Sequence, residues 1–261
     1  MAGPLAAQRQ ALVLERLRTE GAVRVSDLTQ ALGVSQMTVR RDIDDLVRRG
    51  LARKVHGGAS SLASPAHEPA FEAKSGANAE AKRAIARAAA KLVGPGQAIA
   101  ISGGSTTVWM ADELGPRAQA DRLTIVTNSI PAAERLDRAG ASAQCLLTGG
   151  ARTPSQALVG PLAEDAIGSL RFDWFFLGVH GMAEKAGFTT PNVAEAAANR
   201  AFLAAAAATC VLADSSKWDV AALARIAPLG AASHLYSDRA LPAAAARAIR
   251  RTTQLTLVEE T

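Results

Sequence analysis

The chain has 261 residues, of which 49% are hydrophobic, and this length and composition allow a small domain plus a larger one and exclude a largely disordered protein. The net charge of +5 is concentrated in residues 1–60, which hold ten Lys and Arg against six Asp and Glu and so suit a polyanionic partner. No apolar run is long enough for a membrane span and no signal peptide opens the chain, so we expect a cytoplasmic protein with two buried, reduced cysteines, Cys145 and Cys210.

The first sixty residues predict three helices with recognisable ends. A helical pattern of apolar residues begins at Arg9 and ends at Gly21. A shorter helix follows, with Ser26 as its N-cap and Gly33 at its carboxyl end. Ser35 then caps a third helix. One face of this third helix forms an apolar stripe of Val39, Ile43, Leu46 and Val47.

Two short helices joined by a tight turn predict a helix-turn-helix, whose second helix enters the major groove of DNA and reads bases with its first residues. The segment 51–60 alternates apolar and basic residues and ends in glycines, which indicates a hairpin wing beside that helix. A bundle of solvated helices is the alternative, but it leaves the close spacing of the caps and the wing unexplained. The expected DNA-contacting residues are Ser35, Gln36, Met37, Thr38, Arg40 and Arg41 on the helix and Arg53, Lys54 and His56 on the wing.

Residues 61–77 predict a linker between two domains, 1–60 and 78–261, because they are rich in Ala, Ser, Pro and Glu and lack an apolar period. After a helix at about 78–93, apolar strands alternate with helices, which favours a Rossmann-like, mostly parallel α/β sheet. The predicted strands are 97–102, 122–128, 144–150, 171–181 and 209–217, with shorter ones at 225–229 and 233–237. The predicted helices are 105–114, 130–139, 161–170, 193–207 and 242–250.

Polar residues follow several of these strands, and ligands bind parallel sheets at the carboxyl ends of the strands. Small hydroxyls, backbone N–H groups and one lysine suit a phosphate and sugar hydroxyls. The glycines fit neither a P-loop, which needs a GKS or GKT ending, nor the GxGxxG of a dinucleotide site, so we expect no nucleotide cofactor. The cysteine spacing does not suggest a metal site. The expected ligand-binding residues are Gly103, Gly104, Ser105, Thr106, Thr107, Thr127, Asn128, Gly149, Gly150, Glu195, Arg200 and Lys217.

The motifs of both halves resemble one known family. The first half carries R-x3-V-x3-L from Arg9, S-x2-TVRRDI-x2-L-x3-G from Ser35 and R-x2-HGG from Arg53. The second half carries GGSTT, VTNS, TGG, FLGVHG, GFT, EAAANRA and LADSSKW in that order. Together they resemble the DeoR family of bacterial transcription regulators, which combines a winged helix-turn-helix with a sensor domain related to ribose-5-phosphate isomerase.

This resemblance implies a DNA-binding regulator, most often a repressor of a sugar catabolic operon that a phosphorylated sugar or a related intermediate releases from its operator. It further implies that residues 104–107 hold the phosphate and that Lys217 is the cationic partner. A homo-oligomer, dimer or tetramer, is expected because paired half-sites require paired readers. The chain departs from the family at Asn199, where Lys is usual.

Two alternatives stay open at this stage. Glu195 either contacts a ligand hydroxyl, or caps its helix and pairs with Arg200, while His180 is expected to be a loop or packing residue rather than a base. The alternative function is a sugar-phosphate isomerase fused to a DNA-binding domain, which needs a positioned carboxylate base such as Glu195, Asp173 or Asp214. None of these carboxylates lies in a motif that demands catalysis, so we expect no enzyme activity.

Overall fold

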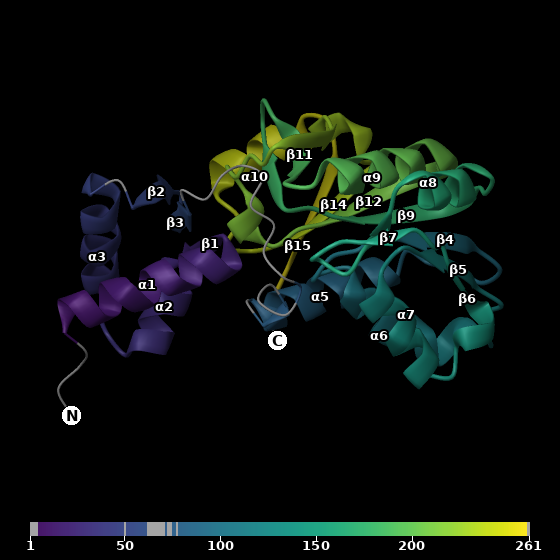
Figure 1. Cartoon of the computed structure of the whole chain (residues 1–261), viewed down its shortest axis with the longest axis horizontal. Helices are drawn as coiled ribbons and strands as arrows, with labels where there is room; N and C mark the ends of the chain where they lie inside the picture. The colour runs from purple at the N-terminus through teal and green to yellow at the C-terminus, as the bar shows by residue number, and fades with distance from the viewer. Residues whose placement is uncertain (1–4, 50, 62–70, 72–74, 77, 260–261) are drawn as a thin grey trace.

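The computed structural model describes residues 5–49, 51–61, 71, 75–76 and 78–259. The linker predicted over 61–77 therefore lies mostly outside the described residues. Figure 1 shows a small amino-terminal domain beside a larger α/β domain. Over the described ranges, none of the helices is both long enough and apolar enough to cross a membrane.

In the amino-terminal domain, helices pack against a three-stranded antiparallel sheet of order β1-β3-β2 (Figure 1). The wing predicted over 51–60 is confirmed as the hairpin of β2 and β3. The elements are α1 (Ala6–Glu20), β1 (Ala22–Arg24), α2 (Val25–Leu32), α3 (Gln36–Arg48), β2 (Ala52–Val55) and β3 (Gly58–Ser61).

The helix ends in this domain follow the predicted capping residues at three positions. Gly21 and Gly33 end α1 and α2 with positive φ angles of 79° and 63°, which glycine adopts without steric cost. The Ser35 hydroxyl starts α3 by accepting a hydrogen bond of 3.2 Å from the backbone N–H three residues on. The prediction of Ser26 as an N-cap is wrong, because β1 runs directly into α2 and Arg24 takes the N-cap position.

The core of this domain combines the predicted apolar stripe with a charge pair. The stripe on α3 is buried except for Val47, which is half-buried. Asp42 lies on the same helix and is also buried. The Arg9 guanidinium donates to both of its carboxylate oxygens, from Nε at 2.7 Å and from Nη2 at 3.2 Å. This fork fixes α1 against α3.

The α/β domain contains a seven-stranded sheet of order β15-β14-β12-β9-β4-β5-β6, and all neighbouring strands are parallel. Helices α5, α6 and α7 cover one face, and α8, α9 and α10 cover the other (Figure 1). The strands are β4 (Ala98–Ile101), β5 (Thr124–Thr127), β6 (Cys145–Leu147), β9 (Phe172–Gly178), β12 (Ala206–Leu212), β14 (His234–Asp238) and β15 (Gln254–Val258). The helices are α5 (Ala79–Ala90), α6 (Val108–Ala118), α7 (Ile130–Arg138), α8 (Pro161–Gly168), α9 (Val193–Ala205) and α10 (Ala243–Arg250). The predicted mostly parallel α/β fold is confirmed.

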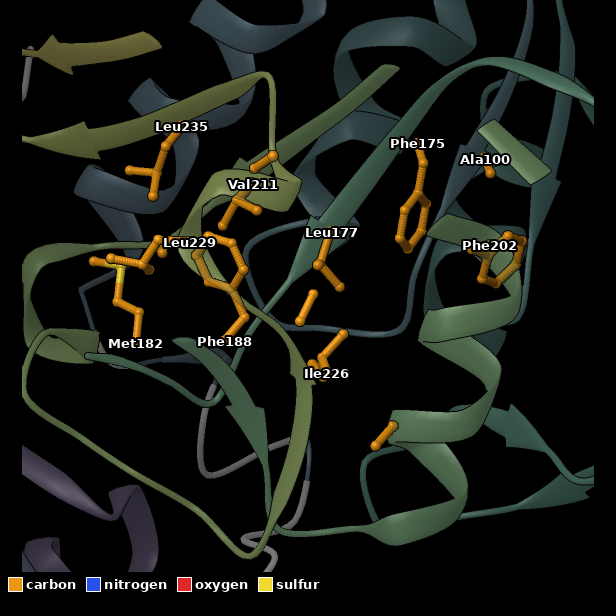
Figure 2. Close-up of a cluster of buried hydrophobic side chains, with 14 of the residues drawn as sticks. Ala100, Phe175, Leu177, Met182, Phe188, Phe202, Val211, Ile226, Leu229 and Leu235 are labelled. Carbon is orange, nitrogen blue, oxygen red and sulfur yellow. The ribbon is translucent and has the colours of Figure 1, made fainter. Parts of the chain in front are cut away.

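Each face of the sheet has its own apolar core. Figure 2 shows the core beneath α9, where Phe175 and Leu177 of β9 meet Phe202 and Phe188. The rings of Phe175 and Phe202 stack with centroids 5.0 Å apart. Because truncating a buried phenylalanine to alanine typically costs about 3–5 kcal/mol of unfolding free energy, this core accounts for much of the domain's stability.

Several strands are not predicted from the sequence, and one predicted strand belongs to a different sheet than expected. The segment predicted as a sheet strand at 225–229 belongs to a separate antiparallel sheet of order β10-β11-β13, and the edge strand β15 has no counterpart in the prediction. These pairings join residues far apart in the chain, so no local pattern reveals them. The additional short strands are β7 (Ala151–Arg152), β8 (Leu158–Val159), β10 (Gly181–Ala183), β11 (Gly187–Thr190) and β13 (Ala224–Ala227).

The two cysteines differ in burial. Cys210 lies on the interior strand β12 and is buried as predicted, and burial raises the pKa of its thiol far above the ordinary value. Cys145 is only half-buried, which corrects the expectation of two buried thiols. Its strand, β6, is the edge of the sheet and is covered less completely.

The strand order opens a crevice beside β4. From β4 the chain builds β5 and β6 on one side of the sheet, and β9, β12, β14 and β15 on the other. The loops that leave the carboxyl ends of β4 and β9 therefore run in different directions, and such a switch point is where open α/β sheets bind ligands.

Candidate ligand pocket and nucleic-acid surface

The amino-terminal domain presents a groove between α3 and the wing. Met37, Arg40 and Arg41 of α3 and Lys54 and His56 of the wing line this groove. All five side chains are exposed, and Met37 is 62% exposed. A protruding helix start with two arginines, flanked by a basic hairpin, has the form and charge that duplex DNA requires.

The other predicted DNA-contacting residues lie around this groove. The hydroxyls of Ser35 and Thr38 are 3.0 Å apart and bond to each other at the start of α3. Gln36 is exposed at the first helical position. Arg53 is exposed but does not line the groove.

The α/β domain holds a pocket at the crevice beside β4. Its walls come from the loops after β4, β9 and β12, from the strand β11 and from one face of α9. The lining residues are Gly103, Gly104, Ser105, Thr106, Ser155, Gly178, Val179, His180, Thr190, Glu195, Asn199 and Lys217.

One end of the pocket is the turn 103–107 between β4 and α6. The helical hydrogen bonds begin with Val108, whose N–H donates to the Gly104 carbonyl at 3.1 Å. The N–H groups before it belong to the helix start, where backbone donors have no acceptor within the helix. A Cβ at Gly103 would lie 2.6 Å from the Cβ of Ala157, so the turn needs glycine at this position.

Lys217 brings a positive charge to the same pocket. It ends the 3₁₀ turn Ser215–Lys217, which follows β12. The hydroxyl-bearing residues Ser105 and Thr106 also line the pocket. Helix-terminal N–H groups, a helix dipole and an ammonium group together favour an anion such as a phosphate.

The other end of the pocket is organised by Glu195 on α9. Its carboxylate accepts hydrogen bonds from the hydroxyls of Thr153 at 2.9 Å, Thr190 at 3.1 Å and Ser155. The cap of α9 is Asn192, whose Oδ1 accepts from the first N–H groups of the helix. Of the two alternatives for Glu195, the structure therefore excludes the capping role and places the carboxylate in the pocket wall.

Asn199 and His180 complete the pocket wall. Asn199 lies one helical turn after Glu195, is 5% exposed, and its Oδ1 has no hydrogen-bond donor among the described residues. His180 lies in the loop after β9, as one of the expected placements has it, and it lines the pocket.

Three of the residues predicted to bind the ligand support the turn 103–107 from behind. Thr107 and Thr127 each donate a hydrogen bond of 2.7 Å to a backbone carbonyl at the end of β4. The Asn128 side-chain oxygen accepts from the Gly103 N–H at 2.8 Å. All three side chains are buried and none lines the pocket, so these side chains support the turn from behind.

Gly149, Gly150 and Arg200 also lie outside the pocket lining. The two glycines have φ angles of 75° and 115°, and a Cβ at Gly150 would lie 2.5 Å from the carbonyl oxygen of Val159. The two glycines therefore allow the backbone turn that leads into the β7–β8 hairpin. Arg200 is exposed and donates to the backbone oxygen of Arg225 at 2.8 Å, because it is one position further around α9 than Asn199.

Six lining residues lie outside the predicted set. The segment Gly178–His180 follows a strong apolar strand, as the predicted segments do, so the same signal was available for it. Ser155 and Thr190 come from hairpins, and Asn199 from a helix face. Only the tertiary packing brings these three to the pocket.

A buried charge cluster joins this pocket to the amino-terminal domain. Arg24, at the end of β1, donates from Nη2 to Asp238 Oδ1 at 3.0 Å and to Asp214 Oδ1 at 3.4 Å. Asn78 donates to the same Asp214 oxygen at 3.0 Å. The two aspartates stand at the carboxyl ends of β12 and β14. The amino-terminal domain therefore contacts the carboxyl ends of the sheet strands, where the pocket also lies.

The electrostatics of Asp214 connect the cluster to the pocket itself. Burial would raise the pKa of Asp214, but the positive charges of Lys217, Lys82 and Arg24 outweigh burial and hold that pKa well below its usual range. Asp214 thus stays ionised between a lysine of the pocket and an arginine of the other domain.

Two family models match the chain. The DeoR-like helix-turn-helix domain matches residues 9–65, and the DeoR C-terminal sensor domain matches residues 77–239. Both matches agree with the domains described above.

Full-length relatives share the same organisation. The transcriptional repressor described for the aga operon of Escherichia coli O157:H7 is 33% identical over 94% of this chain and 90% of its own length. The HTH-type transcriptional regulator GlpR of Haloferax volcanii is 35% identical over 82% of each chain, and the L-fucose operon activator of Haemophilus influenzae is 29% identical over 90% of this chain and 92% of its own. Among solved structures, ribose 5-phosphate isomerase A of Methanocaldococcus jannaschii is 19% identical with a TM-score of 0.41, over 54% of this chain and 55% of its own.

Proposed function

Because the chain belongs to the DeoR family of transcription regulators, we propose that it controls a sugar operon by binding operator DNA and by leaving that DNA when a phosphorylated sugar fills the pocket. The groove between α3 and the wing binds DNA, and the pocket beside β4 senses the sugar phosphate. The observation that carries this proposal is the buried ion pair of Asp214 with Arg24. Lys217 of the pocket lies three residues after Asp214, and its backbone N–H donates to the Asp214 carbonyl at 3.0 Å, so one short segment reaches both a site suited to phosphate and the DNA-binding domain.

The direction of regulation is part of the proposal. The aga-operon relative is a repressor, whereas the L-fucose relative is an activator. We choose repression, because a ligand that disturbs the contact between the domains removes a preformed DNA-binding arrangement.

The phosphate binds at the amino end of α6. There the N–H groups of residues 104–107 donate to the phosphate oxygens, and the Lys217 ammonium balances the charge. The sugar extends toward Glu195 and Asn199 at the opposite end of the pocket.

Release from DNA follows from competition for the charge of Lys217. In the structure that charge contributes to holding Asp214 ionised beside Arg24. A bound phosphate takes up part of the Lys217 charge, which alters the field at the aspartate and the strength of its contact with Arg24. A ligand shifts the arrangement of the domains only if it favours one arrangement over the other, and this contact supplies such a difference.

We propose binding without turnover. Isomerisation needs a carboxylate free to take a proton from the substrate. Glu195 already accepts three hydroxyl hydrogen bonds, Asp214 is engaged with Arg24, and Asp173 accepts from the Ala98 N–H at 2.8 Å, at the start of β4 and away from the pocket. These engagements favour a sensor over the alternative isomerase.

The oligomeric state and location complete the proposal. Operators of helix-turn-helix proteins carry paired half-sites, so we propose a dimer or tetramer that acts in the cytoplasm on its own operator DNA. Light scattering at micromolar protein, with and without that DNA, tests the assembly, and a monomer under both conditions would contradict it.

The test of the function is fluorescence anisotropy on the DNA upstream of the chain's own gene. Hexose 6-phosphates, pentose 5-phosphates and the matching free sugars are titrated onto the complex. We expect one phosphorylated sugar to weaken operator binding by about 5- to 150-fold, the usual range of coupling between two sites, and its free sugar to have no effect.

The matched variants are Lys217→Ala, in the pocket, and Lys185→Ala, which is exposed and lies outside the pocket lining. Lys217→Ala should no longer respond to the sugar phosphate, whereas Lys185→Ala should respond normally. A Lys217→Ala protein that still releases DNA would place the phosphate elsewhere.

A further inference from the structure

Asn199 presents a buried hydrogen-bond acceptor that the protein itself does not use. The residue is 5% exposed and lines the pocket, and its Oδ1 has no donor among the described residues. Buried side-chain oxygens in native proteins nearly always have a partner, so an unpaired one in a pocket wall indicates a partner that arrives with the ligand.

The helix that carries Asn199 does not require this side chain. The first N–H groups of α9 are capped by Asn192, seven residues earlier, and the interior position of Asn199 leaves its backbone to the helix. An asparagine in the interior of a helix has low helix propensity, so its side chain contributes nothing to the local structure that alanine would not.

The neighbours of Asn199 define the chemistry of the missing partner. Glu195 lies four residues earlier on the same helix face, so a carboxylate and an amide oxygen are adjacent in the pocket wall. Both groups accept hydrogen bonds, and one carries a negative charge. A hydroxyl or an ammonium group satisfies them, whereas a carboxylate or a second phosphate is repelled.

The opposite end of the pocket has the reverse character. The start of α6 and Lys217 offer donors and positive charge. The two ends of the pocket therefore differ in character: one end suits an anion, and the other suits hydrogen-bond donors.

We propose that Asn199 reads the end of the ligand remote from the phosphate, and that this ligand is a monophosphate whose remote end carries hydroxyl or amino donors and no second anionic group. The inference rests on the proposed function, in that the phosphate must occupy the α6 end. It narrows the ligand to phosphorylated neutral sugars or amino sugars and excludes sugar bisphosphates and phosphorylated sugar acids.

Isothermal titration calorimetry on the full chain tests the inference. The probes are inorganic phosphate, the 6-phosphates of glucose, galactose, glucosamine and galactosamine, and fructose 1,6-bisphosphate. The variants are Asn199→Leu, which keeps the approximate shape but removes the acceptor, and Asn199→Asp, which keeps the shape and adds a charge.

We expect at least one 6-phosphate to bind the wild type at least tenfold more tightly than both inorganic phosphate and the bisphosphate. Asn199→Leu should weaken that 6-phosphate about tenfold, as the loss of a single buried hydrogen bond predicts, and should leave inorganic phosphate unchanged. Asn199→Asp should shift the preference toward the amino sugar of each pair, because its carboxylate attracts an ammonium group. If circular dichroism shows that Asn199→Leu does not fold, the inference is tested with Asn199→Asp alone, by its change in preference toward the amino sugar.

Two outcomes would overturn the inference while leaving the phosphate site intact. One is that inorganic phosphate binds in a Lys217-dependent manner but no 6-phosphate binds more tightly. The other is that the 6-phosphates bind both Asn199 variants as they bind the wild type, or that the bisphosphate binds equally well. If inorganic phosphate and every sugar phosphate fail to bind the wild type, the proposed function fails, and the inference fails with it.

Discussion

Arg40 and Asp214 illustrate two different electrostatic situations at the scale of single residues. Arg40 is exposed at the start of α3, and its charge is available to a partner. Asp214 is fully buried, and its charge is committed to cations of two domains. The first residue is expected to matter for DNA binding and the second for stability.

Arg40→Ala should weaken operator binding by about 1–3 kcal/mol, because a guanidinium that pairs with a base edge contributes about this much. Anisotropy on operator DNA at physiological salt measures the change. Arg171→Ala, an exposed arginine of the α/β domain, is the control and should bind normally. Equal affinity of Arg40→Ala and the wild type would remove this arginine from the DNA interface.

Asp214→Asn should destabilise the protein by about 3–5 kcal/mol at pH 7, because it leaves buried cations without their counter-charge. The folded-state pKa of Asp214 lies below its ordinary value, so the carboxylate stabilises the fold above that ordinary pKa. This contribution is lost as the pH falls below about 4 toward the folded-state pKa.

Urea unfolding at pH 7 and at about pH 3.5 measures the pH dependence of this contribution. The difference between wild type and Asp214→Asn should shrink at the lower pH. Asp219→Asn, which changes an exposed carboxylate nearby in sequence, should show little difference at either pH. A wild-type advantage over Asp214→Asn that is independent of pH would mean that the carboxylate charge is not its source.

At the scale of elements, the junction of β4 and α6 depends on one close approach. A Cβ at Gly103 would lie 2.6 Å from the Ala157 Cβ, so Gly103→Ala must displace the turn or the β8 segment. We expect a loss of about 1–3 kcal/mol of unfolding free energy, as for overpacking in a core, together with weaker sugar-phosphate binding.

Gly168→Ala is the matched control, because a Cβ there meets nothing within 4 Å at the end of α8. It should be neutral or slightly stabilising, since alanine favours helix over glycine. Thermal unfolding of both variants, with and without the sugar phosphate, measures the two effects. Equal melting temperatures for Gly103→Ala and Gly168→Ala would contradict the steric argument.

The elements that the sequence predicts well are those with their own signals. Gly21, Gly33 and Ser35 mark helix ends through local backbone geometry, and these ends are confirmed. Except for the edge strand β15, the strands of the parallel sheet are apolar runs that the sequence predicts for the same reason. The strands β1, β10 and β11 are too short for a pattern. β13 is predicted as a strand, but its pairing with β11 depends on a distant segment and is not predicted.

The pocket residues also fall into those that the sequence predicts and those that it does not. The turn 103–107 and Lys217 follow strands, and strand order alone brings such loops together. Thr127 and Asn128 also follow a strand, yet their side chains turn inward to hold the backbone of β4 and its turn. Which way a polar side chain turns depends on the space behind it, and the sequence does not contain that information directly.

At the scale of the whole molecule, Arg24 forms a buried contact between the two domains. Its guanidinium reaches Asp238 at 3.0 Å and Asp214 at 3.4 Å, across the boundary between the wing domain and the sheet. If this contact transmits the signal, its loss should separate two activities that the wild type couples.

Arg24→Ala should still bind the sugar phosphate, and it should bind operator DNA more weakly than the ligand-free wild type because it lacks the contact that holds the DNA-binding arrangement. The factor by which the sugar phosphate weakens DNA binding should fall from about 5- to 150-fold to near one, because coupling requires a contact that differs between the two arrangements. Anisotropy titrations with and without the sugar phosphate give this factor. Arg87→Ala, an exposed arginine on α5, is the control, and an unchanged factor in Arg24→Ala would place the connection elsewhere.

The burial of the Arg24 contact gives the molecule two different sensitivities to ionic strength. The Arg24 side chain is 13% exposed and its aspartate partners are 0% and 1% exposed, so dissolved ions screen this contact weakly. Arg40 and Arg41 are exposed, and we expect them to contact DNA from the open surface, where each phosphate contact releases counterions and operator affinity falls steeply with salt. Raising the salt concentration should therefore lower the affinity for operator DNA, while the factor by which the sugar phosphate weakens that affinity stays constant. Osmotic stress in a cell would then change how much regulator is bound to DNA without changing the size of its response to the sugar phosphate.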